Sequence, residues 1–213
     1  MSRGPSTFRL LLWPSLITLA VSIARLVSEV NGWLTNASGG RLLPLGITWC
    51  IFVFGGTMAW RLARAGEGPR RRLPWLWALL ALLAATGTVM WGFRPLLEAD
   101  RSEATFALVR EAVLRGVIVA IVGGLAMFAV WPRLAWTLLL YGLGARATVL
   151  AFTWLAKLQG WDTHYTKFGP PGIERDSMAE TMTSAAIAQL GFWVPFTMIG
   201  GMVAGGLVAR RRQ

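Results

Sequence analysis

The chain has 213 residues, of which 55% are hydrophobic and only 15% are charged. A soluble domain carries about a quarter charged residues, so this composition indicates an integral membrane protein. The net charge of +11 comes largely from arginines in short runs beside apolar segments. That distribution orients multi-pass membrane proteins, and it leaves no free basic stripe for nucleic acid. The single cysteine, Cys50, excludes an intrachain disulfide and any paired-cysteine metal or redox centre.

The apolar runs predict an all-α, six-helix membrane bundle that forms a single domain over residues 1–213. The expected helices cover residues 8–30, 42–65, 74–92, 102–131, 134–158 and 179–209. The first run is too long for a signal-peptide core and lacks a small-residue cleavage site, so we expect an uncleaved span. We expect Pro74 to open the third helix and Pro132 to separate the fourth from the fifth.

The charges of the connections predict that both termini are cytoplasmic. With the N-terminus inside, the inner side collects Arg3, Arg9, Arg61, Arg64, Arg70–Arg72, Arg133 and Arg210–Arg212. Of the ten acidic residues, only Glu67 then lies away from the outer side. Since basic residues near span ends are retained in the cytoplasm, we expect a bacterial-type inner membrane protein with an N-in, C-in topology.

Three arginines inside the predicted spans are expected at a similar depth. Arg25, Arg115 and Arg146 lie about 24, 24 and 20 Å from the inner boundary of an apolar layer about 30 Å thick. Glu29 and Glu111 lie one turn further out, each four residues from an arginine of its own helix. Because polar groups at this depth face the bundle or a wet cavity, we expect helices one, four and five to surround an outward-facing polar pocket.

The fifth helix and the loop after it supply the other candidates. Arg146, Thr153 and Lys157 share one face of that helix at 100° per residue. The loop WDTHYTKFGPPG contains the only histidine, and we expect it to form the rim or lid of the pocket. The candidate ligand-binding residues are therefore Arg25, Glu29, Glu111, Arg115, Arg146, Thr153, Lys157, Asp162, His164 and Tyr165.

Structural interpretations of the same residues stay open. Arg25–Glu29 and Arg115–Glu111 can be ion pairs within their own helices that reach the outer interface. Arg146 has no acid within four residues of its own helix, so it needs a partner on another helix, water or an anionic ligand. One histidine with scattered carboxylates lacks a recognised ligand spacing, so we expect no metal and no cofactor.

The last helix contains Gly201 and Gly205 at the spacing of a GxxxG motif, which permits close helix contact. We expect this motif to serve packing within the chain, with Gly123 and Gly124 of the fourth helix as the facing groove. A homodimer seam is the alternative.

No Ser-His-Asp elbow, HExxH, GxGxxG or phosphate-binding loop is present. We therefore expect a non-enzymatic protein, either an accessory subunit of a membrane complex or a binder of a small anionic ligand or lipid. The alternative is a small transporter or proton-coupled carrier that uses Arg146, Glu29, Glu111 and His164. Apolar inner halves of helices four and five argue against that route. An intramembrane lipid-modifying enzyme ranks third, because no nucleophile–base pair is apparent.

Overall fold

A computed structural model describes residues 4–36, 45–94, 103–167 and 177–210, and in this part of the chain the fold is entirely helical. The long helices are α1 (Thr7–Val30), α2 (Thr48–Arg64), α3 (Pro74–Phe93), α5 (Glu103–Val130) and α6 (Pro132–Leu158). The last helix runs through α7 (Met178–Ala186), the π-helical segment η2 (Ile187–Trp193) and α8 (Val194–Arg210). A short 3-10 turn, η1 (His164–Thr166), follows α6. The prediction of an all-helical fold is confirmed.

Among the described residues, five helical segments are long and apolar enough to cross a membrane. They are Thr7–Val30, Pro74–Gly92, Ala107–Val130, Pro132–Leu158 and Met178–Ala209. The remaining long helix, α2, has 17 residues. Its expected start at residue 42 lies outside the described residues, and residues 45–47 form a turn and bends before it. The membrane class expected from composition is thus supported by these five helices, and the sixth span stays a prediction.

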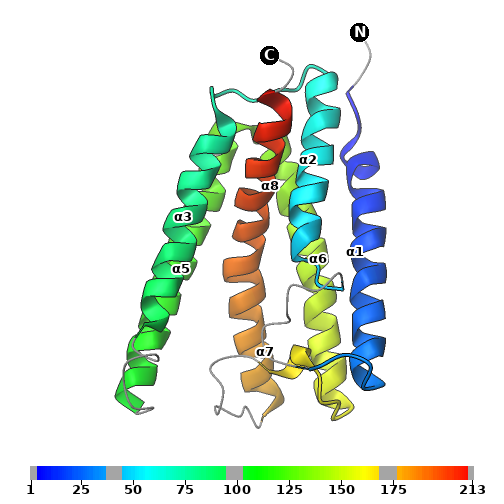
Figure 1. The fold of residues 1–213 in the computed structure, drawn as a ribbon, viewed down its shortest axis with the longest axis vertical. Coiled ribbons are helices and arrows are strands. Elements are labelled where there is room, and N and C mark those ends of the chain that lie inside the picture. The colour runs from blue at the N-terminus through cyan, green and yellow to red at the C-terminus, as the bar shows by residue number, and fades with distance from the viewer. Residues whose placement is uncertain (1–3, 37–44, 95–102, 168–176, 211–213) are drawn as a thin grey trace.

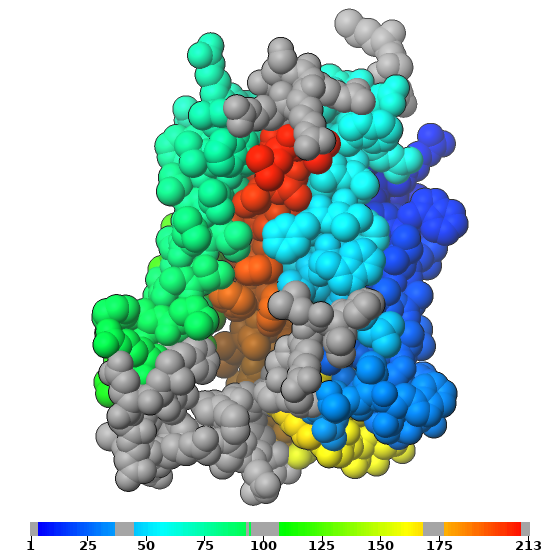
Figure 2. All heavy atoms as spheres, in the orientation of Figure 1, coloured from blue at the N-terminus to red at the C-terminus, as the bar shows by residue number. Residues whose placement is uncertain are grey.

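All long helices run along one axis, and α1 begins at the end of the bundle where α8 ends (Figure 1). We call this the basic end, because it carries Arg9, Arg61, Arg64, Arg70–Arg72 and Arg133. The opposite end, which holds η1 and the start of α7, is called the loop end. In Figure 2, α8 is recessed between α3 and α2. α1 packs mainly on α6, while α3 and α5 pair on the other side.

Glycines bring α8 close to α2. Gly201 and Gly205 both lie against Gly55, and a Cβ on Gly55 would overlap the backbone of Gly201. Small residues four apart allow helix backbones to approach in this way. The GxxxG motif therefore serves packing within the chain. Its facing groove is on α2 and not at Gly123 and Gly124, which pack against an earlier turn of α8.

One proline marks the start of α6, and another explains the widened turns before α8. The sequence predicts that the fifth helix begins at 134, but Pro132 is the first residue of α6 and Trp131 makes the break. A proline at this position loses nothing, since the N–H it lacks would have no helical partner.

In α8, Pro195 cannot donate to the Gly191 carbonyl and its ring crowds that group. The preceding turns widen into η2, which relieves this conflict.

The half of the bundle next to the basic end is sealed by apolar side chains. Its fully buried residues include Leu10, Met58, Leu62, Met127, Trp131, Leu134, Leu138 and Met202. The buried charged residues in the described part of the chain are Arg25, Glu29 and Arg146. Arg146 is at the middle of its helix, and the other two lie toward the loop end.

Candidate functional site

Arg146 lies in the middle of α6, with 4% of its surface exposed. Its Cζ atom is 4.9 Å from the ring centroid of Trp193, so the guanidinium lies over the indole. Its Nη1 donates a long hydrogen bond of 3.4 Å to Oε1 of Gln189. Its Nε is buried without a hydrogen-bond partner, and no described carboxylate forms an ion pair with it.

These contacts compensate the Arg146 charge only in part. A cation–π contact is worth about 2 kcal/mol when desolvated. The effective penalty for taking an ion out of water is several kcal/mol. A guanidinium has five donors in a fixed fork, and this fork matches a carboxylate or phosphate. The Arg146 centre (Arg146, Gln189 and Trp193) therefore has the chemistry of an anion site.

Both protein partners of Arg146 belong to η2. A π-helical segment adds residues to its turns and so rotates the helix before it relative to the helix after it. Gln189 and Trp193 thus depend on this distortion for their position against α6. Such segments occur frequently at functional sites.

A second polar group lies along α1. Thr18, Ser22, Arg25 and Glu29 follow one another at a 4-3-4 spacing, and all four are buried, so this polar stripe faces the bundle. The Thr18 hydroxyl is 2.7 Å from the hydroxyl of Tyr141 on α6, and the Ser22 hydroxyl donates to the Thr18 carbonyl at 2.8 Å. The Thr18 hydroxyl therefore joins α1 to α6, while the Ser22 hydroxyl is satisfied within α1.

Glu29 ties the loop after α6 to α1. Its Oε1 accepts from Nε of Arg25 at 2.8 Å. Its Oε2 accepts from the backbone N–H of His164 at 2.9 Å and lies 2.7 Å from Nδ1 of the same residue. The Glu29 side chain is fully buried, and 18% of the His164 side chain is exposed. We call Arg25, Glu29 and His164 the loop latch. Both oxygens of this buried carboxylate have partners, as a buried charge requires.

Tyr165 and Asp162 flank the latch. The ring of Tyr165 lies 3.9 Å from that of His164, and its hydroxyl donates to the Ser22 carbonyl at 3.4 Å. Burial raises the pKa of Tyr165, so its hydroxyl stays protonated at neutral pH. Asp162 is exposed and its Oδ2 accepts from Nδ2 of Asn36 at 2.5 Å. These contacts fix the loop at the loop end of the bundle.

Glu111 and Arg115 do not join either group, which corrects the predicted pocket between helices one, four and five. They pair with each other at 2.5 Å, with 60% and 68% of their side chains exposed. α5 also lies on the other side of the bundle from α1 (Figure 1). Because the two residues are four apart, they compensate each other on the outer face of their helix.

The predicted stripe on α6 does not form one site either. Thr153 is buried, but its hydroxyl donates to the Val149 carbonyl of its own helix at 2.9 Å. Lys157 is half-buried, about 16 Å along the helix from Arg146. A small ligand at Arg146 therefore does not reach Lys157.

Gln189 and Trp193 were not among the residues predicted from the sequence. The available signal was that Gln189 is an uncharged but strongly polar residue inside the apolar run of the last helix. Within the described ranges, no three His, Cys, Asp or Glu side chains come together as metal ligands would.

The described part of the chain is thus a bundle of helices, most of them long and apolar enough to cross a membrane. Inside it the charge of Arg146 is buried and has no carboxylate partner among the described residues. Comparisons with known protein families, characterised proteins and solved structures find no match for this chain.

Proposed function

We propose that the chain is a six-span, bacterial-type inner-membrane protein that binds an anionic amphiphile, through its carboxylate or phosphate, at the Arg146 centre. The observation that carries this proposal is the buried guanidinium of Arg146, which has no carboxylate partner in the described part of the chain. The arginines of the basic end favour a cytoplasmic location for that end and for both termini. The protein would act alone or as an accessory subunit.

The sealed half of the bundle favours a binder over a carrier. Between the Arg146 centre and the basic end, the buried core is formed by residues such as Leu138, Met58 and Trp131. A charged group would lose its hydration there without gaining a partner. A proton-coupled carrier is the second candidate, and the buried Glu29 beside the partly exposed His164 is the observation in its favour.

Isothermal titration calorimetry of the purified full chain in nonionic detergent tests the anion site. The probes are laurate and dodecyl phosphate, with dodecanol as the uncharged control of equal chain length. We expect both anions to bind and dodecanol not to bind. Arg146→Leu should weaken binding about 10- to 100-fold, because each hydrogen bond to a charged group contributes about 1.5–3 kcal/mol. Arg146→Lys should keep part of the affinity, as it keeps the charge but not the fork.

Arg115→Leu is the matched control, since it removes an exposed arginine from another helix. The Arg146→Leu protein should fold, because replacing a poorly compensated buried charge by an apolar side chain is often neutral or stabilising. Wild-type affinity in folded Arg146→Leu, or equal losses in both variants, would refute the Arg146 site. Uptake of protons by liposomes containing the chain would instead support the carrier.

A further inference from the structure

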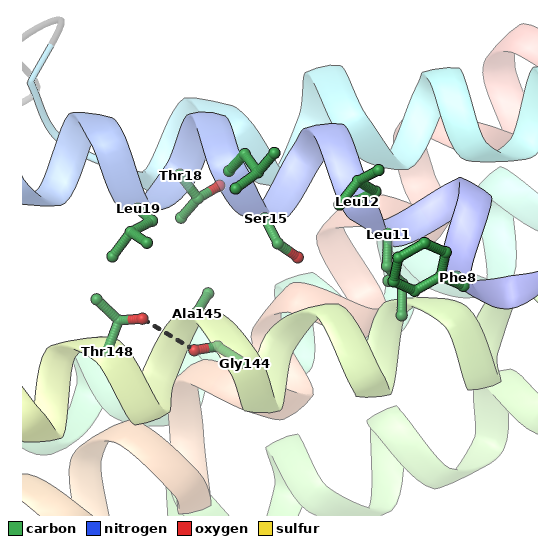
Figure 3. Close-up of a pocket in the computed structure, with 10 residues that line it drawn as sticks. Phe8, Leu11, Leu12, Ser15, Thr18, Leu19, Gly144, Ala145 and Thr148 are labelled. Atoms are coloured by element: carbon green, nitrogen blue, oxygen red, sulfur yellow. Dashed lines mark hydrogen bonds between the residues drawn. The ribbon is translucent and has the colours of Figure 1, made fainter.

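A groove of about 290 Å³ lies between α1 and α6 (Figure 3). On α1 it is lined by Phe8, Leu12 and Leu19, and on α6 by Gly144 and Thr148. The side chains of the two helices face each other across it. At 100° per residue, Gly144 and Thr148 are each about 160° from Arg146, so the groove is on the other side of α6 from the Arg146 centre.

The walls of this groove suit hydrocarbon. The exposed fractions of Phe8, Leu12 and Leu19 are 69%, 37% and 38%, so an apolar surface remains open to the side of the bundle. The Thr148 hydroxyl donates to the Gly144 carbonyl, so this pair is satisfied within α6, and Ser15 adds one hydroxyl to a wall that is otherwise mainly apolar. A Cβ on Gly144 would meet no atom within 4 Å, so this glycine does not serve helix contact but leaves the groove floor open.

Positive charge surrounds the end of the groove at the basic end. Phe8 lines the groove there, and its neighbour Arg9 is exposed. Nη1 of Arg61 donates to the Arg9 carbonyl at 3.2 Å, and Nη2 of Arg133 donates to the Pro5 carbonyl at 3.2 Å. Three guanidinium groups thus lie around the start of α1, and one of them, that of Arg133, is paired with Glu67 at 3.1 Å, which leaves Arg9 and Arg61 for a headgroup. Basic residues at a membrane surface attract anionic lipid headgroups by about 1 kcal/mol each.

The geometry points to an anionic phospholipid of the inner leaflet, with one acyl chain in the groove and its phosphate beside Arg9 and Arg61. This inference rests on the membrane orientation proposed above and is independent of ligand binding at Arg146. The complementary charge at the groove end selects the headgroup, and the apolar walls hold the chain.

Native mass spectrometry of the full chain tests the inference, with phosphatidylglycerol and phosphatidylcholine of identical acyl chains as probes. We expect the wild type to retain one phosphatidylglycerol in preference to phosphatidylcholine. Gly144→Leu should fill the groove floor and lower this retention about tenfold. Arg9→Gln should reduce the preference for phosphatidylglycerol while phosphatidylcholine still binds.

Gly87→Leu is the matched control. Gly87 is an exposed glycine of α3 whose Cβ would also meet nothing within 4 Å, and both substitutions raise helix propensity, so both proteins should fold. Wild-type retention in Gly144→Leu, equal loss in both glycine variants, or no preference for phosphatidylglycerol would overturn the inference. Arg146→Leu should retain phosphatidylglycerol, so the groove and the Arg146 centre can fail separately.

Discussion

Two Arg–Glu pairs with the same spacing have different environments in this protein. Arg25 and Glu29 are buried, and Glu29 has a second partner in His164. Arg115 and Glu111 are exposed and pair with each other. An exposed i,i+4 pair contributes about 0.3–0.5 kcal/mol, whereas breaking a buried pair costs about 3–5 kcal/mol. The same i,i+4 spacing therefore gives a surface ion pair on α5, whereas on α1 it gives a buried ion pair that attaches the loop after α6.

Glu29→Gln should consequently destabilise the protein by about 3 kcal/mol, because it leaves Arg25 charged and buried without a carboxylate. Glu111→Gln, the same change in the exposed pair, should alter stability by less than about 0.5 kcal/mol. Urea unfolding in detergent micelles, followed by circular dichroism, measures both. Equal effects of the two substitutions would mean that the loop latch does not hold the loop in solution.

The sequence singled out Arg146 correctly as a residue without an acid in its own helix, but it did not supply its partners. Gln189 and Trp193 are more than 40 positions away, and no local pattern links them to α6. The stripe on α1 was predictable because its 4-3-4 spacing follows the helix period. Its contact with His164 was not, because the path of a loop depends on tertiary packing.

At the scale of elements, helix ends followed from local chemistry where a cap or a proline was present. The capping box of Ser177 and Glu180 begins α7 at Met178, one residue before the expected start. Apolar runs also located the long helices. The π-helical segment was not predictable, because hydrophobic periodicity assumes a regular α-helix and does not reveal where a proline changes the turn.

Pro195→Ala should restore a regular α-helix through η2, since it supplies the missing N–H and removes the ring from the Gly191 carbonyl. A regular α-helix holds fewer residues per turn than η2 does. The loss of about one residue from the widened turn would rotate Gln189 by about 100° relative to α8. Laurate affinity should therefore fall about tenfold. Pro14→Ala, in the interior of α1 and away from the Arg146 centre, should leave it unchanged. Calorimetry measures the laurate affinity, and hydrogen exchange of residues 187–193 shows whether a regular α-helix has formed. If the helix becomes regular and the affinity does not change, η2 does not position Gln189 and Trp193 for binding.

For the whole molecule, hydropathy and loop charge predict how the chain threads but not how helices are arranged around the bundle. Position in the chain predicts the depth of Arg115, but it does not predict its exposure, which follows from the place of α5 beside α3. Contacts at the basic end join distant segments. Arg133 reaches the Pro5 carbonyl, and the Arg70 N–H donates to the Val130 carbonyl. The start of α1, the connection between α2 and α3, and the junction of α5 and α6 thus share one end. Because α1 ends at the loop end, the chain must return to the basic end before α3, and α2 forms the last part of that return (Figure 1).

This shared end leads to a test of six spans and of orientation. In a Cys50→Ala background, Ser6→Cys, Arg71→Cys and Asp162→Cys each place one thiol at an exposed position. If α2 crosses the membrane, so that its two ends lie on opposite sides, a membrane-impermeant maleimide should label Asp162→Cys in intact spheroplasts. It should label the other two only after permeabilisation, because arginine-rich connections are retained inside. If α2 does not cross, Arg71→Cys becomes accessible from outside and Asp162→Cys is protected, so the two variants exchange their labelling pattern while Ser6→Cys stays protected.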